Sequence, residues 1–198
     1  MRIAIIGTGR VGSALVKGWK AAGHTVQAAS RGTEPGVATV AAWAEVIVLA
    51  VPYAALQELA PQIAPATGKI IIDCTNPIAM GSDGMGLALG HTTSGGEALQ
   101  AALPDAQVVK ALNQVGAEVM ADTQGFAHPP VQFLAGDDEM AKERVAALLV
   151  DLGFEPLDAG DLAKARLLEP FALVWINQAI ARKKGRDWAL GALPRAGR

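Results

Sequence analysis

Short apolar runs alternate along the chain with longer amphipathic segments. The apolar runs are rich in Val, Ile, Leu and Ala, which is typical of strands covered on both faces. They predict strands at Arg2 to Ile6, His24 to Ala29, Val46 to Val51, Lys69 to Cys74, Gln107 to Ala111, Val131 to Ala135 and Phe154 to Ala159. The segments between them predict helices at Val11 to Ala22, Leu56 to Ala64, Gly95 to Leu103 and Asp138 to Leu152. This alternation indicates an α/β fold, a doubly wound parallel sheet with helical crossovers on both faces.

Two segments depart from this alternation. Ile78 to Ser94 is rich in Gly, Ser, Thr and Met, and it predicts a long loop of the kind that is usually functional or mobile. Leu162 to Lys183 predicts a strongly apolar helical region with a kink at Pro170. We therefore expect a sheet domain over residues 1–160 and a small C-terminal helical extension over residues 161–198. The extension should pack on the sheet domain or on another subunit.

Composition restricts the classes of function. Of the 198 residues 51% are hydrophobic and 18% charged, which excludes intrinsic disorder. The formal net charge of −2 disfavours a nucleic-acid partner. The strongest apolar run, Val46 to Leu56, has 11 residues, whereas a membrane-spanning helix needs about 20, so no membrane partner is expected. A single cysteine, Cys74, excludes a disulfide framework and a Cys-rich zinc site, and it favours a reducing, cytoplasmic setting.

The strongest motif directly follows the first predicted strand. It reads Gly7-Thr8-Gly9-Arg10-Val11-Gly12 and opens a helix. In a Gly-x-Gly-x-x-Gly turn the first glycine makes the tight turn, the second lets the backbone approach a pyrophosphate, and the third lets helix and strand pack closely. The helix N-terminus then offers unpaired N–H groups and a positive dipole end to the anion. A turn that merely needs glycines would not explain the alternating frame that follows, so we predict a dinucleotide-binding Rossmann domain.

The end of the second predicted strand bears on which dinucleotide binds. NAD-specific domains carry an acid there for the ribose 2′-OH, but this chain has Ser30, Arg31 and Thr33 and no acid before Glu34. Arginine suits planar, bidentate recognition of a 2′-phosphate. We predict NADP(H) rather than NAD(H), the alternative being that Arg31 is a solvated loop residue. Arg10 could reach the same 2′-phosphate or the pyrophosphate, or equally lie on the surface.

Other strand ends supply further candidates, because ligands of open α/β sheets lie beyond the carboxyl ends of the strands. The cofactor-binding candidates there are Val51, Pro52, Tyr53, Asn76, Pro77 and Asn113. The Val51–Pro52 backbone can border the adenosine ribose. Tyr53 could stack near the cofactor or be an ordinary surface tyrosine. Asn76 could hydrogen-bond the nicotinamide ribose or carboxamide, or simply start a turn. Asn113 could line the nicotinamide side of the cleft.

No catalytic acid/base set is evident. Cys74 has no basic partner nearby in the sequence and is better interpreted as a small buried residue. Asp73 fits a strand-end residue that caps the following turn. The three histidines lack metal-ligand spacing, so neither a metal nor a catalytic residue is assigned. Hydride transfer between two cofactors needs mainly orientation and a dry cleft, which suits a chain without such a set.

The motifs together resemble those of the NADPH-dependent reductases of the deazaflavin coenzyme F420 (NADP oxidoreductases, coenzyme F420-dependent). The matching elements are Gly7 to Gly12, Ser30-Arg31, Val51-Pro52, Thr75-Asn76-Pro77, Val109 to Asn113, Ala135 to Asp138, Leu157 to Gly160 and Ala165 to Glu169. The resemblance implies hydride exchange between NADP(H) and the deazaflavin in a small homo-oligomer, a homodimer for instance. It also implies that Thr8 to Val11 hold the pyrophosphate and that Ser30 and Arg31 hold the 2′-phosphate.

Three other functions remain open at this point. The chain is also similar to the reductase part of membrane ferric reductases, which suggests an NADPH-dependent flavin or ferric reductase. An imine reductase resembling pyrroline-carboxylate reductase is less favoured, because its long helical dimer domain has little room after Gly160. A non-catalytic NADP(H)-sensing module is the alternative outside enzymes. The acceptor therefore stays undetermined, with coenzyme F420 or a flavin as the hydride partner.

Overall fold

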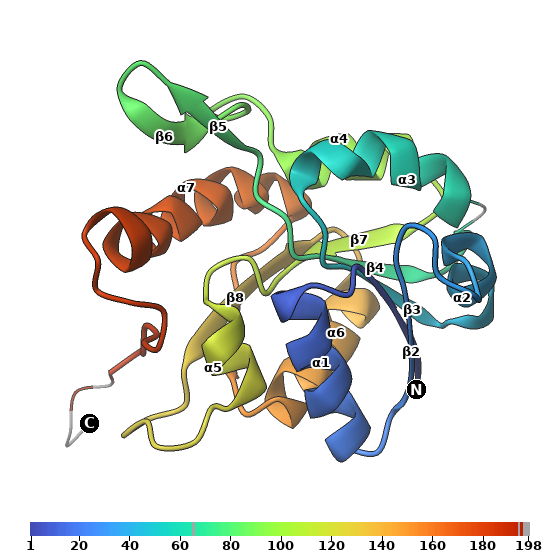
Figure 1. Ribbon diagram of the computed structural model, residues 1–198, viewed down its shortest axis with the longest axis horizontal. Helices are drawn as coiled ribbons and strands as arrows, with labels where there is room; N and C mark the ends of the chain where they lie inside the picture. The colour runs from blue at the N-terminus through green and yellow to red at the C-terminus, as the bar shows by residue number, and fades with distance from the viewer. Residues whose placement is uncertain (65, 194, 196–198) are drawn as a thin grey trace.

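A central sheet forms the middle layer of the molecule (Figure 1). The computed structural model describes residues 1–64, 66–193 and 195. Within these residues the sheet has seven strands, in the order β2-β1-β3-β4-β7-β8-β9. Their bounds are β1 (Arg2–Ile6), β2 (Thr25–Ala29), β3 (Val46–Leu49), β4 (Ile70–Asp73), β7 (Gln107–Lys110), β8 (Val131–Gly136) and β9 (Glu155–Asp158). The first five in this order run parallel, and Ile6 lies opposite both Ala29 and Leu49, so the carboxyl ends of the first three are level.

The predicted doubly wound parallel α/β sheet is confirmed, and it departs from the parallel arrangement at one pairing. β8 pairs antiparallel with β7, and β9 is parallel to β8. The connection between β7 and β8 holds a helix of only five residues, α5 (Ala117–Ala121). A parallel pair needs a crossover to the opposite edge of the sheet, usually through a full helix. Here β8 starts at the end of the sheet where β7 stops, so the chain needs no crossover to the other end.

Helices cover both faces of the sheet, as a doubly wound fold requires. They are α1 (Arg10–Ala21), α2 (Val37–Trp43), α3 (Leu56–Ile63), α4 (Gly95–Ala102) and α6 (Glu139–Asp151). Figure 1 shows α3 and α4 on one side of the sheet and α1, α5 and α6 on the other. Because side chains alternate along a strand, Ile3 and Ile5 of β1 join one apolar core while Ala4 and Ile6 join the other. The short helices α2 and α5 were not predicted.

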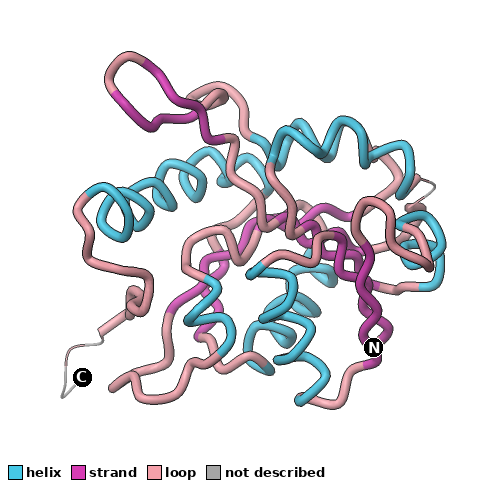
Figure 2. Tube along the Cα trace, in the orientation of Figure 1, coloured by secondary structure: helices cyan, strands magenta, loops and turns pink. Residues whose placement is uncertain are grey.

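The segment Ile78 to Ser94, expected as a loop, contains an antiparallel hairpin. β5 (Ile78–Gly81) pairs with β6 (Gly84–Leu87) through a two-residue turn, and Gly84, which follows the turn, has a φ of +101° that favours glycine. The hairpin projects from the body of the molecule (Figure 2) and leaves Met80 74% exposed. The prediction failed because few of its residues are β-branched, so the usual alternating strand pattern is missing.

The C-terminal extension packs on the sheet domain. A 3₁₀ turn, η2 (Leu162–Lys164), leads into α7 (Ala165–Ile176), which continues through Pro170. The change of helical geometry comes later, in the π-helical turn η3 (Asn177–Ala181). Phe171 of α7 meets Phe133 of β8 edge-on, with 5.5 Å between the ring centroids. Beyond η3 the chain returns, and Trp188 stacks on Trp175 of α7.

Candidate dinucleotide-binding site

The turn between β1 and α1 has three glycines in three different environments. Gly7 has a φ of +111°, and a Cβ there would collide with the carbonyl group of Ala50. A Cβ on Gly12 would collide with the carbonyl oxygen of Gly7. Gly9, in contrast, has nothing within 4 Å of the position that its Cβ would take. The turn therefore packs tightly on the sheet and on its own helix but is open over Gly9, where an anionic group can approach the backbone.

The N-terminus of α1 is free of side-chain caps. Gly9 precedes the helix, and no side chain among the described residues accepts a hydrogen bond from the first turn. Thr8 donates its hydroxyl proton to Oγ of Ser30, 3.2 Å away, which links the glycine turn to the end of β2. Arg10 forms an ion pair with Glu118 of α5. The uncapped N–H groups and the dipole of α1 make this helix end suitable for a pyrophosphate.

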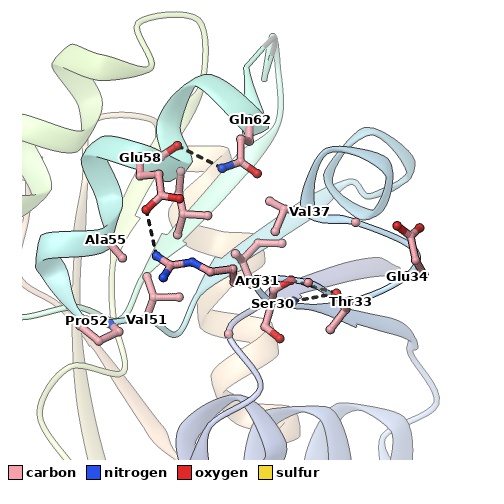
Figure 3. A pocket seen from close by; sticks show the side chains of 15 residues that line it. Ser30, Arg31, Thr33, Glu34, Val37, Val51, Pro52, Ala55, Glu58 and Gln62 are labelled. Atoms are coloured by element: carbon pink, nitrogen blue, oxygen red, sulfur yellow. Dashed lines mark hydrogen bonds and ion pairs between the residues drawn. The ribbon is translucent and has the colours of Figure 1, made fainter.

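A turn at the end of β2 presents Arg31. The hydroxyl of Thr33 accepts from the N–H of Ser30 and donates to the carbonyl oxygen of Ser30, both at 3.0 Å. Gly32 between them has a φ of +76°. The hydroxyl of Thr33 is engaged within the turn, so Thr33 shapes the backbone, while the side chain of Arg31 extends from the turn toward Glu58 (Figure 3).

A cavity of about 460 Å³ lies between this turn and α3. Val51 and Pro52 lie at its base and Ala55 contributes apolar surface from the far wall (Figure 3). Gly7 and Leu59 also line it. Such a volume is within the range of small-molecule sites, and its lining combines apolar surface with a few polar groups. The side chain of Arg31 is 85% exposed and forms an ion pair with Glu58, at 3.0 Å. The cavity has the size and chemistry for the adenosine end of a phosphorylated dinucleotide.

The loops that follow β4 and β7 are held together by side-chain amides. Nδ2 of Asn76 donates to the carbonyl oxygen of Asn113 at 2.8 Å, and Nδ2 of Asn113 donates to Oδ1 of Asn76 at 2.9 Å. Asn113 also donates to the carbonyl oxygen of Leu168 in α7. Gln114 continues the network by bonding Asn113 and both backbone groups of Phe133. Both asparagines are thus engaged in fixing these two strand ends against α7.

Three buried charged side chains lie beneath the same strand ends. Nζ of Lys110 is 2.9 Å from Asp73, 2.8 Å from Glu169 and 2.6 Å from the carbonyl oxygen of Thr75. Each of the three side chains is at most 1% exposed. Glu169 also accepts from the N–H groups of Gly95 and Gly96 at the start of α4. This cluster of Lys110, Asp73 and Glu169, called the buried ion cluster below, ties β4, β7, α4 and α7 to one another.

The electrostatics of the buried ion cluster favour a charged lysine. Burial alone would lower the pKa of Lys110, but the carboxylates of Asp73 and Glu169 outweigh burial and hold this pKa above its ordinary value. Asp73 also accepts from the N–H of Thr75, so it caps the turn as the sequence indicates. Lys110 and Glu169 lie within the motifs that resemble the family, but the sequence alone predicts no role for them, because their partners are far away along the chain.

Tyr53 and Cys74 border this region without entering the cavity. Tyr53 lies in the 3₁₀ turn η1 (Tyr53–Ala55) and lines a separate groove between α3 and α4. Burial, together with the carboxylates of Glu169 and Asp73, raises the pKa of Tyr53. Cys74 packs against the apolar core, and burial, with a contribution from Asp73, raises the pKa of its thiol. A thiol in such a setting stays protonated at neutral pH, which fits a packing residue.

The structure brings some of the predicted residues together and separates others. The cavity lining includes Gly7, Ser30, Arg31, Thr33, Val51 and Pro52. The remaining candidates lie outside this lining: Thr8 to Gly12 of the glycine turn, Tyr53, Asn76, Pro77 and Asn113. Sequence reasoning missed the contributions of α2, of the turn η1 and of α3, namely Val37, Ala55, Glu58, Leu59 and Gln62. The signal for α3 was present, since a helix that starts just after Val51-Pro52 must place its first turn at the same edge of the sheet.

Fold and site together define a class: an NADP(H)-binding Rossmann domain of the oxidoreductase kind. The family of NADP oxidoreductases, coenzyme F420-dependent, matches residues 2–39 and 33–77. A crystal structure from Arthrobacter sp. FB24, provisionally assigned as an F420-dependent NADP reductase, is 32% identical, with a TM-score of 0.83 over 97% of this chain and 100% of that one. A hypothetical protein from Sinorhizobium meliloti is 31% identical, with a TM-score of 0.72 over 83% of this chain and 88% of that one.

The chain therefore belongs to the family of coenzyme F420-dependent NADP oxidoreductases. It is also 32% identical to the metalloreductase STEAP3 of Rattus norvegicus, over 87% of this chain but only 36% of that longer protein. An imine reductase from Aspergillus terreus, 16% identical with a TM-score of 0.65 over 91% of this chain and 63% of that one, shares the fold. Among residues 1–64, 66–193 and 195, no helix has the length and apolar character needed to cross a bilayer.

Proposed function

We propose that this oxidoreductase exchanges a hydride between NADP(H) and a deazaflavin, coenzyme F420, or an acceptor of similar shape. The observation that carries the proposal is the cavity beside Arg31, which opens at the glycine turn and is bounded by Val51 and Pro52. Its position matches the adenosine end of a dinucleotide whose pyrophosphate lies at the start of α1. The family to which the chain belongs supports the choice of acceptor.

Each part of the site has a separate task in this proposal. The bound nicotinamide supplies the hydride chemistry. The uncapped N–H groups of α1 bind the pyrophosphate, and Ser30 and Arg31 bind the 2′-phosphate. The reacting ends would lie near the loops after β4 and β7, which Asn76 and Asn113 hold together. Transfer between two ring systems depends on their alignment, which can lower a barrier by roughly 7–11 kcal/mol, so no acid/base set is required of the protein.

The test is an absorbance assay of NADPH oxidation with oxidised coenzyme F420, FMN or FAD offered separately. Turnover with F420 and not with the flavins is the expected result. Turnover with a flavin, and reduction of added ferric chelate, would instead favour an NADPH-dependent flavin or ferric reductase, which the similarity to the rat metalloreductase supports. Tight NADPH binding without turnover of any acceptor would favour a non-catalytic NADP(H)-sensing module.

We further propose that the protein is a cytoplasmic homo-oligomer, a homodimer for instance, that associates through its C-terminal helical region. On α7, Leu167 and Val174 are 63% and 58% exposed, and they lie on one face because they are seven residues apart. Exposed apolar groups that share a helix face often mark an interface. Light scattering after gel filtration should detect the oligomer, and a Leu167→Glu/Val174→Glu variant should be monomeric. A monomeric parent protein would refute this part.

A further inference from the structure

Two oppositely charged side chains face each other across the adenosine cavity. Arg31 extends from the turn after β2, and Glu58 extends from the first turn of α3 on the opposite wall (Figure 3). One terminal guanidinium nitrogen, Nη2 of Arg31, donates to Oε2 of Glu58 at 3.0 Å. The two residues come from different elements, 27 positions apart in the chain, so the pair spans the cavity.

The charges around the cavity are not arranged solely for a phosphate. Among the described residues of its lining, Arg31 carries the one positive charge, while Glu34 and Glu58 carry negative charges. The carboxylate of Glu34 points away from Arg31 in Figure 3, whereas that of Glu58 is in contact with it. A 2′-phosphate that approaches Arg31 therefore meets a guanidinium that already has an anionic partner.

We propose that Glu58 is a specificity-determining residue: its carboxylate occupies the side of Arg31 that the 2′-phosphate takes, and the competition sets how strongly the site prefers NADP(H) to NAD(H). This inference rests on the proposed placement of NADP(H). A phosphate monoester carries about −1.5 to −2 charges near neutral pH, so it outcompetes a carboxylate for the same guanidinium. The carboxylate must then move away, and the binding of the phosphorylated cofactor is weakened by the lost pair and by repulsion.

The size of the effect follows from the exposure of the pair. The side chains of Arg31 and Glu58 are 85% and 63% exposed, and ion pairs in such settings are weak because water screens them. Removal of the Glu58 charge should therefore tighten the binding of a 2′-phosphorylated nucleotide by only about 2- to 5-fold. The gain should shrink as salt is added, because screening at 1 M ionic strength acts over about 3 Å.

The experiment titrates the full-length protein with 2′,5′-ADP and, separately, 5′-AMP by calorimetry at low ionic strength. These probes differ in the 2′-phosphate and need neither a nicotinamide nor an acceptor. Glu58→Gln should tighten 2′,5′-ADP by about 2- to 5-fold and leave 5′-AMP unchanged. Glu34→Gln is the matched control, since it removes the same charge from the same cavity without a contact to Arg31, and it should have the smaller effect.

Four outcomes would overturn the inference. Unchanged or weaker binding of 2′,5′-ADP by Glu58→Gln would mean that Glu58 positions Arg31 or does nothing. If Glu34→Gln raised the affinity for 2′,5′-ADP equally, the overall electrostatic potential of the cavity would be the cause. If Glu58→Gln raised this affinity just as much in a protein that also carries Arg31→Ala, competition for Arg31 would be excluded. If the parent protein does not prefer 2′,5′-ADP to 5′-AMP, the proposed placement of the cofactor fails as well. A parent that prefers 2′,5′-ADP without responding to Glu58→Gln removes the present inference alone.

Discussion

The buried ion cluster allows a prediction about stability that can be worked out residue by residue. Lys110 lies between Asp73 and Glu169, and none of the three side chains is more than 1% exposed. Breaking a buried ion pair by removing one partner typically costs about 3–5 kcal/mol, because the remaining charge is left without compensation. Lys110→Met leaves two buried carboxylates without a cation. Glu169→Gln leaves the Lys110–Asp73 pair intact.

We therefore expect unequal losses of unfolding free energy from the two changes. Lys110→Met should cost about 4 kcal/mol or more, near the upper end of the range, and Glu169→Gln about 2–3 kcal/mol, because the single amide oxygen can still accept from one of the two N–H groups, Gly95 or Gly96, that bond different oxygens of Glu169. Against a total stability of about 5–15 kcal/mol for a domain, either loss is readily measured. Asp161→Asn is the control. The ion pair of Asp161 with Lys164 is half exposed, so its loss should lower the unfolding free energy by less than about 1 kcal/mol.

The assay is urea unfolding followed by tryptophan fluorescence, in which the buried Trp175 reports on α7. A smaller loss for Lys110→Met than for Glu169→Gln would refute the charge argument. The pH dependence gives a second check. Because the pKa of Lys110 is raised on folding, its contribution is fully present below the unfolded pKa of about 10.4 and is lost as the pH rises through the higher folded value. The difference in unfolding free energy between the parent and Lys110→Met should thus stay constant up to about pH 10 and become smaller above it.

Three substitutions and one chemical modification test the cofactor site and its surroundings. Arg31→Ala should weaken the binding of NADPH by about 10- to 150-fold in a fluorescence titration and leave the binding of NADH unaffected. Equal losses of affinity for both cofactors would contradict the assignment of Arg31 to the 2′-phosphate. Gly12→Ala should abolish NADPH binding and lower the melting temperature, because its Cβ would strike the carbonyl of Gly7, whereas Gly9→Ala should weaken binding with little change in stability. Alkylation of Cys74 by iodoacetamide at pH 8 should be far slower than that of free cysteine, because burial raises the pKa of its thiol; rapid labelling of the folded protein would contradict this.

Much of the fold was predictable because its signals are local. The strand Arg2–Ile6 was predicted to the residue. The helix α1 ends at Ala21, shortly before Gly23, whose φ of +86° suits the residue that follows a helix end. The direction of β8 was not predictable in the same way. An apolar run has the same pattern in either direction, so only the length and content of the preceding connection carry the information. The hairpin was missed because Met and Gly dominate its strands.

In the candidate site, too, the residues recognised by local sequence signals were predicted, whereas those that depend on distant partners were not. Ser30 and Arg31 were predicted because the residues at the end of the second strand of a Rossmann domain bind the ribose 2′ group, and this rule needs only one stretch of sequence. Glu58 is 27 residues from Arg31, and Glu169 is 74 residues from Gly95. Pairings at such separations depend on which strand ends become neighbours, and therefore on the sheet order. We propose that the boundary near residue 160 separates two parts in sequence only, since Glu169 anchors the extension inside the sheet domain.

The two ends of the proposed site are built to different degrees of rigidity. At the adenosine end the polar contact is an exposed ion pair between Arg31 and Glu58, which a phosphate can displace at small cost. At the other end, Asn76 and Asn113 exchange hydrogen bonds after the strands that carry Asp73 and Lys110 of the buried ion cluster, whose disruption would cost several kcal/mol. Hydride transfer requires close alignment of the reacting rings but tolerates adjustment at the remote phosphate. In the proposed placement, affinity and cofactor preference are therefore set where the protein is adaptable, and alignment is set where it is fixed.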